Sequence, residues 1–157
     1  MISVEDYLSF VDAALDGMVG IVTELGDELA NRRPDLPGAN SPYVILTHCL
    51  GVMEYWAGHL VAGRHIQRDR DAEFRAAGPV ADLVERTRRA RRQLQADLTD
   101  LEPFAAPRGT PRPDDADAPR GRTQGGALLH VYEELAQHRG QMESCRDVLL
   151  APWAKLA

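Results

Sequence analysis

Three residues whose side chains can bind a metal ion recur at intervals of four toward the end of the chain: His130, Glu134 and His138. Residues four apart lie on one face of a helix, with Cβ atoms about 5–6 Å apart. These positions lie on or beside an apolar stripe, as does His48 in an earlier segment. The pattern predicts that imidazoles and a carboxylate converge on the interior from two helices, as in bundle metal sites.

The chemistry of this group follows from the cost of burying it. An isolated ionised Glu134 in an apolar core costs several kcal/mol, and neutral imidazoles need partners for their acceptor nitrogens. A divalent cation satisfies both needs. Two histidines and one glutamate form a catalytic type of zinc ligand set, which leaves coordination positions for water or substrate. Cys49 points about 100° away from His48 and Cys145 lies two turns beyond His138, so neither thiol is expected to be a ligand.

The same residues also have interpretations that involve no metal ion. His48 alone on an apolar face fits a hydrogen-bonded core histidine, and Glu134 with His138 fits a surface pair at spacing i,i+4. His130 lies near the start of its helix and fits an outer contact to the site, a substrate contact or an exposed residue.

Length and charge restrict the class of protein. The 157 residues correspond to one domain, residues 1–157, which can bury an adequate core without disulfides. The net charge of −6 argues against a nucleic-acid partner, which would require a basic face, and against an anionic membrane surface.

Cysteine content and hydropathy predict a cytoplasmic protein. Both cysteines lie in helical patterns, which fits a reducing compartment. The N-terminus has no basic region followed by an apolar run, so no signal peptide is expected. The most apolar stretch, Val44–Gly63, contains three side chains that are expensive in lipid: His48, Glu54 and His59. We therefore expect no membrane partner.

Four segments carry apolar residues at intervals of three and four, and no segment alternates with a period of two over a useful length. The expected helices run from Ser3 to Leu29, from Ser41 to Leu60, from Pro79 to Leu98 and from Ala127 to Leu150. The sequence therefore predicts an all-α protein, most simply a four-helix bundle. Long loops are expected at about 63–78 and 103–126, and one or the other of them is expected near the opening of the site.

Two short motifs resemble those of DinB-like proteins. They are the segment Asn40–His48, followed by Glu54–Trp56, and the segment Glu133–Gln141. The most similar subgroup resembles the metal-binding domain of mycothiol-dependent maleylpyruvate isomerase. The resemblance covers nearly the whole chain as four helices.

The resemblance implies a metal triad with one histidine on the second helix and two ligands on the fourth, here His48, Glu134 and His138. It also implies zinc or a similar divalent ion such as nickel, and a homodimer. The isomerase has an additional C-terminal domain, which these 157 residues do not include. The resemblance therefore favours a transferase that uses a low-molecular-weight thiol of the mycothiol type.

The expected reaction is attack of this thiol on a small electrophile. A free thiol has a pKa near 8.5, and coordination to a divalent cation deprotonates it. Arg139 is a candidate to hold a carboxylate of either substrate, or else forms a helix-surface ion pair. A metal-dependent hydrolase and a non-catalytic, stress-related helical dimer are the alternative functions.

Overall fold

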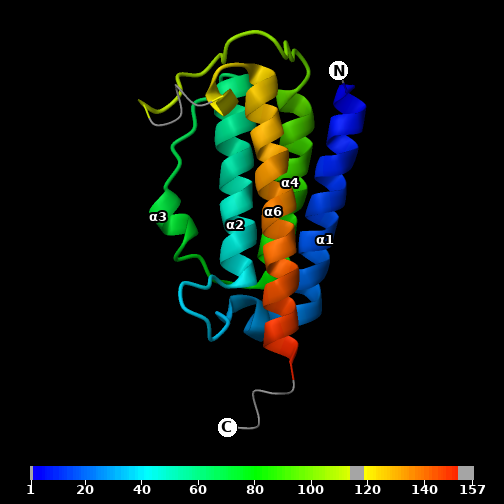
Figure 1. Cartoon of the computed structure of the whole chain (residues 1–157), viewed down its shortest axis with the longest axis vertical. Coiled ribbons are helices and arrows are strands. Elements are labelled where there is room, and N and C mark those ends of the chain that lie inside the picture. Colours follow the sequence, from blue (N-terminus) through cyan, green and yellow to red (C-terminus); the bar gives the residue numbers. More distant parts are fainter. Residues whose placement is uncertain (1, 114–118, 152–157) are drawn as a thin grey trace.

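Four long helices run side by side in the computed structural model, which describes residues 2–113 and 119–151 (Figure 1). They are α1 (Val4–Asn31), α2 (Pro42–Met53) with its continuation η1 (Glu54–Val61), α4 (Val80–Asp97) and α6 (Gln124–Leu150). Helix α6 packs against α1 and α2, and α4 packs against the same two helices. The prediction of an all-α bundle is confirmed, and the described residues contain no strand.

Side-chain caps set where the helices begin. Ser3 and Asp6 form a capping box at the start of α1, and the Ser41 hydroxyl accepts a hydrogen bond from the Val44 N–H ahead of α2. The Thr123 hydroxyl accepts from the Gly126 N–H, so α6 begins at Gln124, three residues before its predicted start. Each such cap contributes about 1 kcal/mol.

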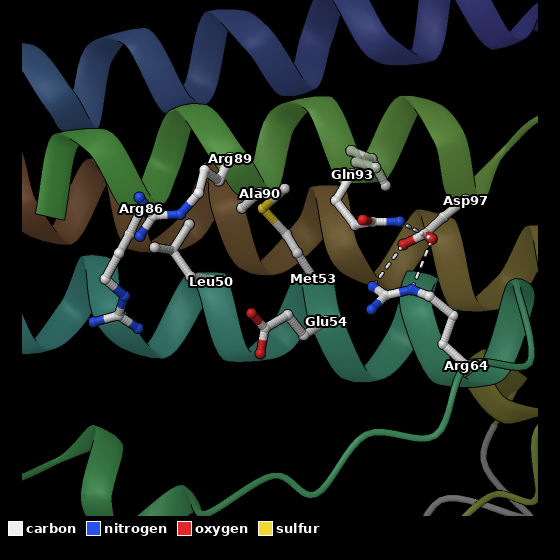
Figure 2. A pocket seen from close by; sticks show the side chains of 10 residues that line it. Leu50, Met53, Glu54, Arg64, Arg86, Arg89, Ala90, Gln93 and Asp97 are labelled. Atoms are coloured by element: carbon white, nitrogen blue, oxygen red, sulfur yellow. Dashed lines mark hydrogen bonds and ion pairs between the residues drawn. The ribbon is translucent and has the colours of Figure 1, made fainter.

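Two long helices depart from the regular form that their periodicity predicts. Gly26 has φ of +65°, which interrupts α1 one turn before its end. The second helix widens to a π-helix over η1. Just beyond η1, the Arg64 guanidinium donates two hydrogen bonds of 2.8 and 2.9 Å to Asp97 at the end of α4 (Figure 2). This bidentate ion pair ties the end of the π-helix to its neighbour.

The segment 63–78, predicted as a polar loop, contains the short helix α3 (Arg70–Glu73). The Asp69 carboxylate accepts from the Ala72 N–H and so caps this helix. Helix α3 packs on α2, and every residue of α2 is buried. A single helical turn has no measurable periodicity, which explains why the sequence pattern missed it.

The core lies among the four long helices and includes the fully buried side chains of Leu15, Leu46 and Leu135. Burying each such side chain contributes about 1.5–3 kcal/mol. None of the helices in the described ranges combines the length and apolar character needed to span a bilayer. The predicted domain 1–157 and loop 103–126 include residues 1, 114–118 and 152–157, which lie outside the described residues.

Candidate metal centre

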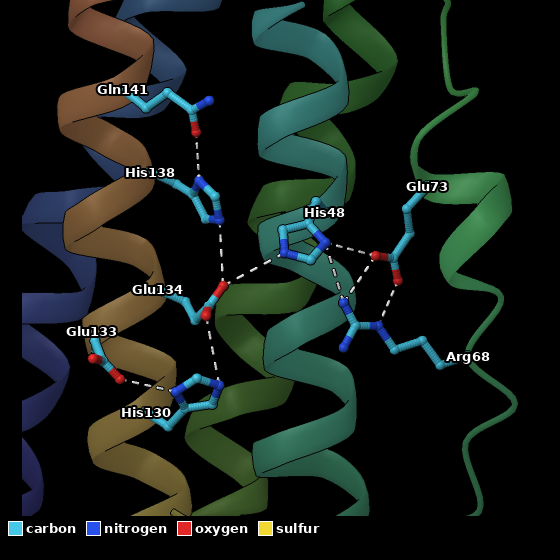
Figure 3. Close-up of polar contacts among 8 residues, drawn as sticks. All are labelled: His48, Arg68, Glu73, His130, Glu133, Glu134, His138 and Gln141. Carbon is cyan, nitrogen blue, oxygen red and sulfur yellow. Dashed lines mark hydrogen bonds and ion pairs between the residues drawn. The ribbon is translucent and has the colours of Figure 1, made fainter. Parts of the chain in front are cut away.

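Helices α2 and α6 bring together the three residues predicted as a triad. His48 lies on α2, and Glu134 and His138 lie one turn apart on α6 (Figure 3). One ligand atom from each of the three side chains lies within 4.8 Å of the other two. The His48 side chain is only 7% exposed, whereas those of Glu134 and His138 are 22% and 23% exposed. The group therefore has a buried end on α2 and an accessible end on α6.

The spacing of these atoms fits a shared cation. The Oε2 atom of Glu134 lies 3.5 Å from Nε2 of His48 and 3.3 Å from Nε2 of His138. A tetrahedral zinc ion with ligands at about 2.0–2.1 Å places neighbouring ligand atoms roughly 3.3–3.5 Å apart. The donor set and these two distances thus fit a divalent cation held by three protein ligands, with the two imidazole nitrogens within 4.8 Å of each other.

Contacts on the far side of both imidazole rings orient them toward this centre. Nδ1 of His48 lies 2.9 Å from Oε2 of Glu73, and Nδ1 of His138 lies 2.8 Å from Oε1 of Gln141 (Figure 3). An oxygen acceptor at Nδ1 favours the tautomer with the proton on Nδ1. In the neutral rings the lone pair then lies on Nε2, which faces Glu134, as a metal ligand requires. Without an ion, a proton on Nε2 makes the contact with Glu134 instead.

Glu73 is itself held in place by Arg68. Nε and Nη2 of Arg68 donate hydrogen bonds of 2.6 and 2.8 Å to the two carboxylate oxygens. Both side chains are at least nine-tenths buried. Burial favours a neutral carboxyl, but Arg68 and His48 lower the pKa of Glu73 below its ordinary value. The carboxylate is therefore ionised, and it can accept the proton of Nδ1.

The side chains of the triad shift one another's pKa values even without an ion. Burial alone would lower the pKa of His48, but Glu134 and Glu73 together raise it above the ordinary value. Hydrogen-bond contacts with His138 and His48 lower the pKa of Glu134 well below its usual range. The centre thus carries an ionised carboxylate that attracts a cation or a proton.

His130 lies beside this group without being one of the three converging residues. Its Nε2 is 3.6 Å from Oε1 of Glu134, and its Nδ1 is 3.0 Å from Oε2 of Glu133. The ring also packs edge-on to Trp56, with centroids 4.5 Å apart. Of the three roles considered for His130 from the sequence, these contacts fit an outer contact to the centre.

Arg139 lies on a different face of α6. Its Nε donates to Glu143 at 3.0 Å, and its Nη1 donates to the backbone carbonyl of Ala13 on α1. The structure does not bring Arg139 together with the triad, and its observed contact is the ion pair considered as the alternative. Substrate binding by Arg139 stays a prediction.

Neither cysteine is among the converging ligands. Cys49 and Cys145 are both buried free thiols, and burial raises the pKa of each. A raised pKa reduces the thiolate fraction at neutral pH, so these thiols are poor nucleophiles.

Sequence reasoning missed Arg68 and Glu73, because they come from the segment 63–78, which shows no periodicity. The one local signal is Asp69, a good N-cap residue placed three positions before Ala72. That signal predicts a helical turn at this place, but it does not indicate that the turn folds back onto His48.

The fold and the site define a class of protein: a four-helix bundle with a histidine and carboxylate centre between its second and last long helices. A family model for the DinB superfamily matches residues 11–142, and the chain belongs to this superfamily. None of the curated proteins compared with the chain matches it. The membership agrees with the family predicted from the two motifs and leaves the isomerase-like subgroup as a prediction.

Proposed function

We propose that this protein is a metal-dependent transferase that activates a low-molecular-weight thiol, of the mycothiol type, for attack on a small electrophile. The observation that carries the proposal is the convergence of His48, Glu134 and His138 at spacings that suit one divalent cation. A cation held there would act as a Lewis acid that lowers the pKa of a thiol bound at an open coordination position.

The ligand set suits an anionic nucleophile. Two neutral imidazoles and one carboxylate leave a divalent ion with a net charge of +1, which favours an incoming thiolate over a neutral ligand. The partial exposure of the Glu134 and His138 side chains supports an open side of the centre that faces solvent. Because both cysteines are buried and carry raised pKa values, we assign the nucleophile to an external thiol.

In this scheme His130 accepts the thiol proton. Its Nδ1 lies 3.0 Å from the Glu133 carboxylate, which favours a proton on Nδ1 and leaves the lone pair on Nε2, beside Glu134. The sulfur electron pair forms the new C–S bond. The electrophile releases its leaving group with the electrons of the broken bond, and the proton passes from Nε2 to solvent.

An assay with N-acetylcysteine and chlorodinitrobenzene tests the proposal, because attack at the ring carbon releases chloride and forms a coloured thioether. The zinc-loaded protein should accelerate this reaction, and the chelator-treated protein and His138→Ala should not. Ester hydrolysis without thiol would favour the hydrolase, and inactivity in both assays would favour a non-catalytic helical protein. A raised thiol KM in Arg139→Gln would support a binding role for Arg139.

A further inference from the structure

Two neighbouring cavities lie along the second helix, on the side that faces α4. One, of about 200 Å³, is bounded by α2, α3 and α4, and the other, of about 290 Å³, is bounded by α2, η1 and α4 (Figure 2). Glu54 and Arg86 line both cavities, so the two meet at these side chains. No residue of the triad is among the described residues that line them. The pair of cavities is therefore separate from the candidate metal centre.

Glu54 and Arg86 carry opposite charges but do not pair with each other. Both side chains are exposed, and neither forms an ion pair or a side-chain hydrogen bond with another described residue. The other arginines of α4 each lie within 3.8 Å of a carboxylate oxygen: Arg88, Arg89, Arg91 and Arg92. Figure 2 shows Glu54 and Arg86 on the same side of the α2–α4 pair. The two cavities thus share an open carboxylate and an open guanidinium.

The smaller cavity has a polar lining. Thr47 is only 4% exposed, and its hydroxyl oxygen has no hydrogen-bond partner within the described part of the chain. Gln67, which precedes α3, adds an exposed amide. An unsatisfied buried hydroxyl is costly, so a polar ligand group that reaches it is favoured over an apolar one.

The larger cavity has an apolar floor. Leu50, Met53 and Leu94 line it, and each is at most 3% exposed. At its far end the Asp97 carboxylate accepts hydrogen bonds from Arg64 and from the Gln93 amide, so the polar groups there already have partners. The combination suits a ligand with a charged head at one end and an apolar body at the other.

We propose that the two cavities together bind a free α-amino acid with an apolar side chain. The Glu54 carboxylate receives the ammonium group, and Arg86 binds the carboxylate through its forked N–H donors. The side chain of the ligand lies over Leu50 and Met53. A ligand with only one of the two charges leaves either Glu54 or Arg86 without a partner, which disfavours it. This inference goes beyond the proposed function and does not depend on it.

Calorimetric titration of the wild type with L-leucine and L-methionine tests the binding. We expect at least one of them to bind. The N-acetyl derivative, which lacks the ammonium group, and the amide, which lacks the carboxylate, should each bind about tenfold more weakly or less, because each loses a hydrogen-bonded charge. The inference would be overturned if neither amino acid bound, or if either derivative bound as tightly as its parent.

Variants at the two charged positions assign each charge of the ligand. Glu54→Gln should bind the amino acid about tenfold more weakly and no longer discriminate against the N-acetyl derivative. Arg86→Gln should show the same loss and no longer discriminate against the amide. The control is Arg88→Gln, whose arginine is 65% exposed on α4 and pairs with Glu85. Wild-type affinity in Glu54→Gln or Arg86→Gln would contradict the site, and so would weakened binding in the control.

Amino acids also coordinate metal ions, so the titration is repeated with His138→Ala, which removes a ligand of the triad and leaves both cavities intact. Unchanged amino-acid binding in His138→Ala supports a separate site, whether or not thiol transfer is ever found. Binding that is lost in His138→Ala would assign the amino acid to the metal centre and would overturn the inference.

Discussion

The carboxylate of Glu73 lies 2.9 Å from Nδ1 of His48, on the side of the ring opposite the triad. It thus holds the histidine in the orientation that a metal ligand needs, and Arg68 holds the carboxylate. Partners of this kind are worth 10- to 100-fold in metal affinity or activity in other proteins.

We therefore expect Glu73→Gln to weaken zinc binding by roughly 10- to 100-fold, because the amide no longer balances the charge of Arg68 or fixes the ring tautomer. Competition with a chelator of known affinity measures the change. Asp71→Asn, an exposed position on the same short helix, is the matched control. Unchanged zinc affinity in Glu73→Gln would show that this carboxylate does not support metal binding.

A methyl group at Gly51 tests the same contact without removal of any polar atom. A Cβ built at Gly51 would lie 2.6 Å from Cδ of Glu73, and closer still to its Oε1. Gly51→Ala should therefore displace the carboxylate, weaken zinc binding and destabilise the fold by about 1–3 kcal/mol.

Gly20→Ala is the control for this change, because nothing lies within 4 Å of a Cβ at that helical position. It should stabilise the fold by about 0.5–1 kcal/mol, as alanine does in a helix interior. Chemical denaturation measures both variants. Similar stabilisation in Gly51→Ala would mean that Glu73 moves aside freely.

Replacement of His130 distinguishes an acceptor of the thiol proton from a metal ligand. We expect His130→Gln to retain zinc and to lower kcat for thiol transfer by about 100-fold or more, the usual contribution of a general base. The exposed His65→Gln variant should leave both quantities unchanged. Loss of zinc from His130→Gln would show that His130 is a ligand.

The periodicity of apolar residues was sufficient to predict the bundle, because each long helix buries one stripe against its neighbours. It could not predict the break at Gly26 or the π-helix η1, because the apolar residues continue at intervals of four through both places. The convergence of His48 with Glu134 and His138 followed from inward positions on two helices. The contact with Glu73 could not be predicted, because it depends on how a loop without periodicity folds over α2.

Burial of both thiols predicts how the cysteines react. Burial raises the pKa of Cys49 and of Cys145, so little thiolate exists at neutral pH, and the fold restricts access to each sulfur. In the native protein both should react with a thiol-specific reagent many times more slowly than in denaturant. Rapid labelling of either native thiol would reopen the possibility that the protein supplies its own nucleophile.

The metal content of the purified protein and its ligand variants tests the central claim most directly. We expect about one divalent ion per chain in the wild type by elemental analysis. Its loss is expected in each of His48→Ala, Glu134→Ala and His138→Ala, and circular dichroism should show that their helical content is kept. A wild type that cannot be loaded with any divalent ion would contradict the account, and so would full occupancy in any one of the three variants.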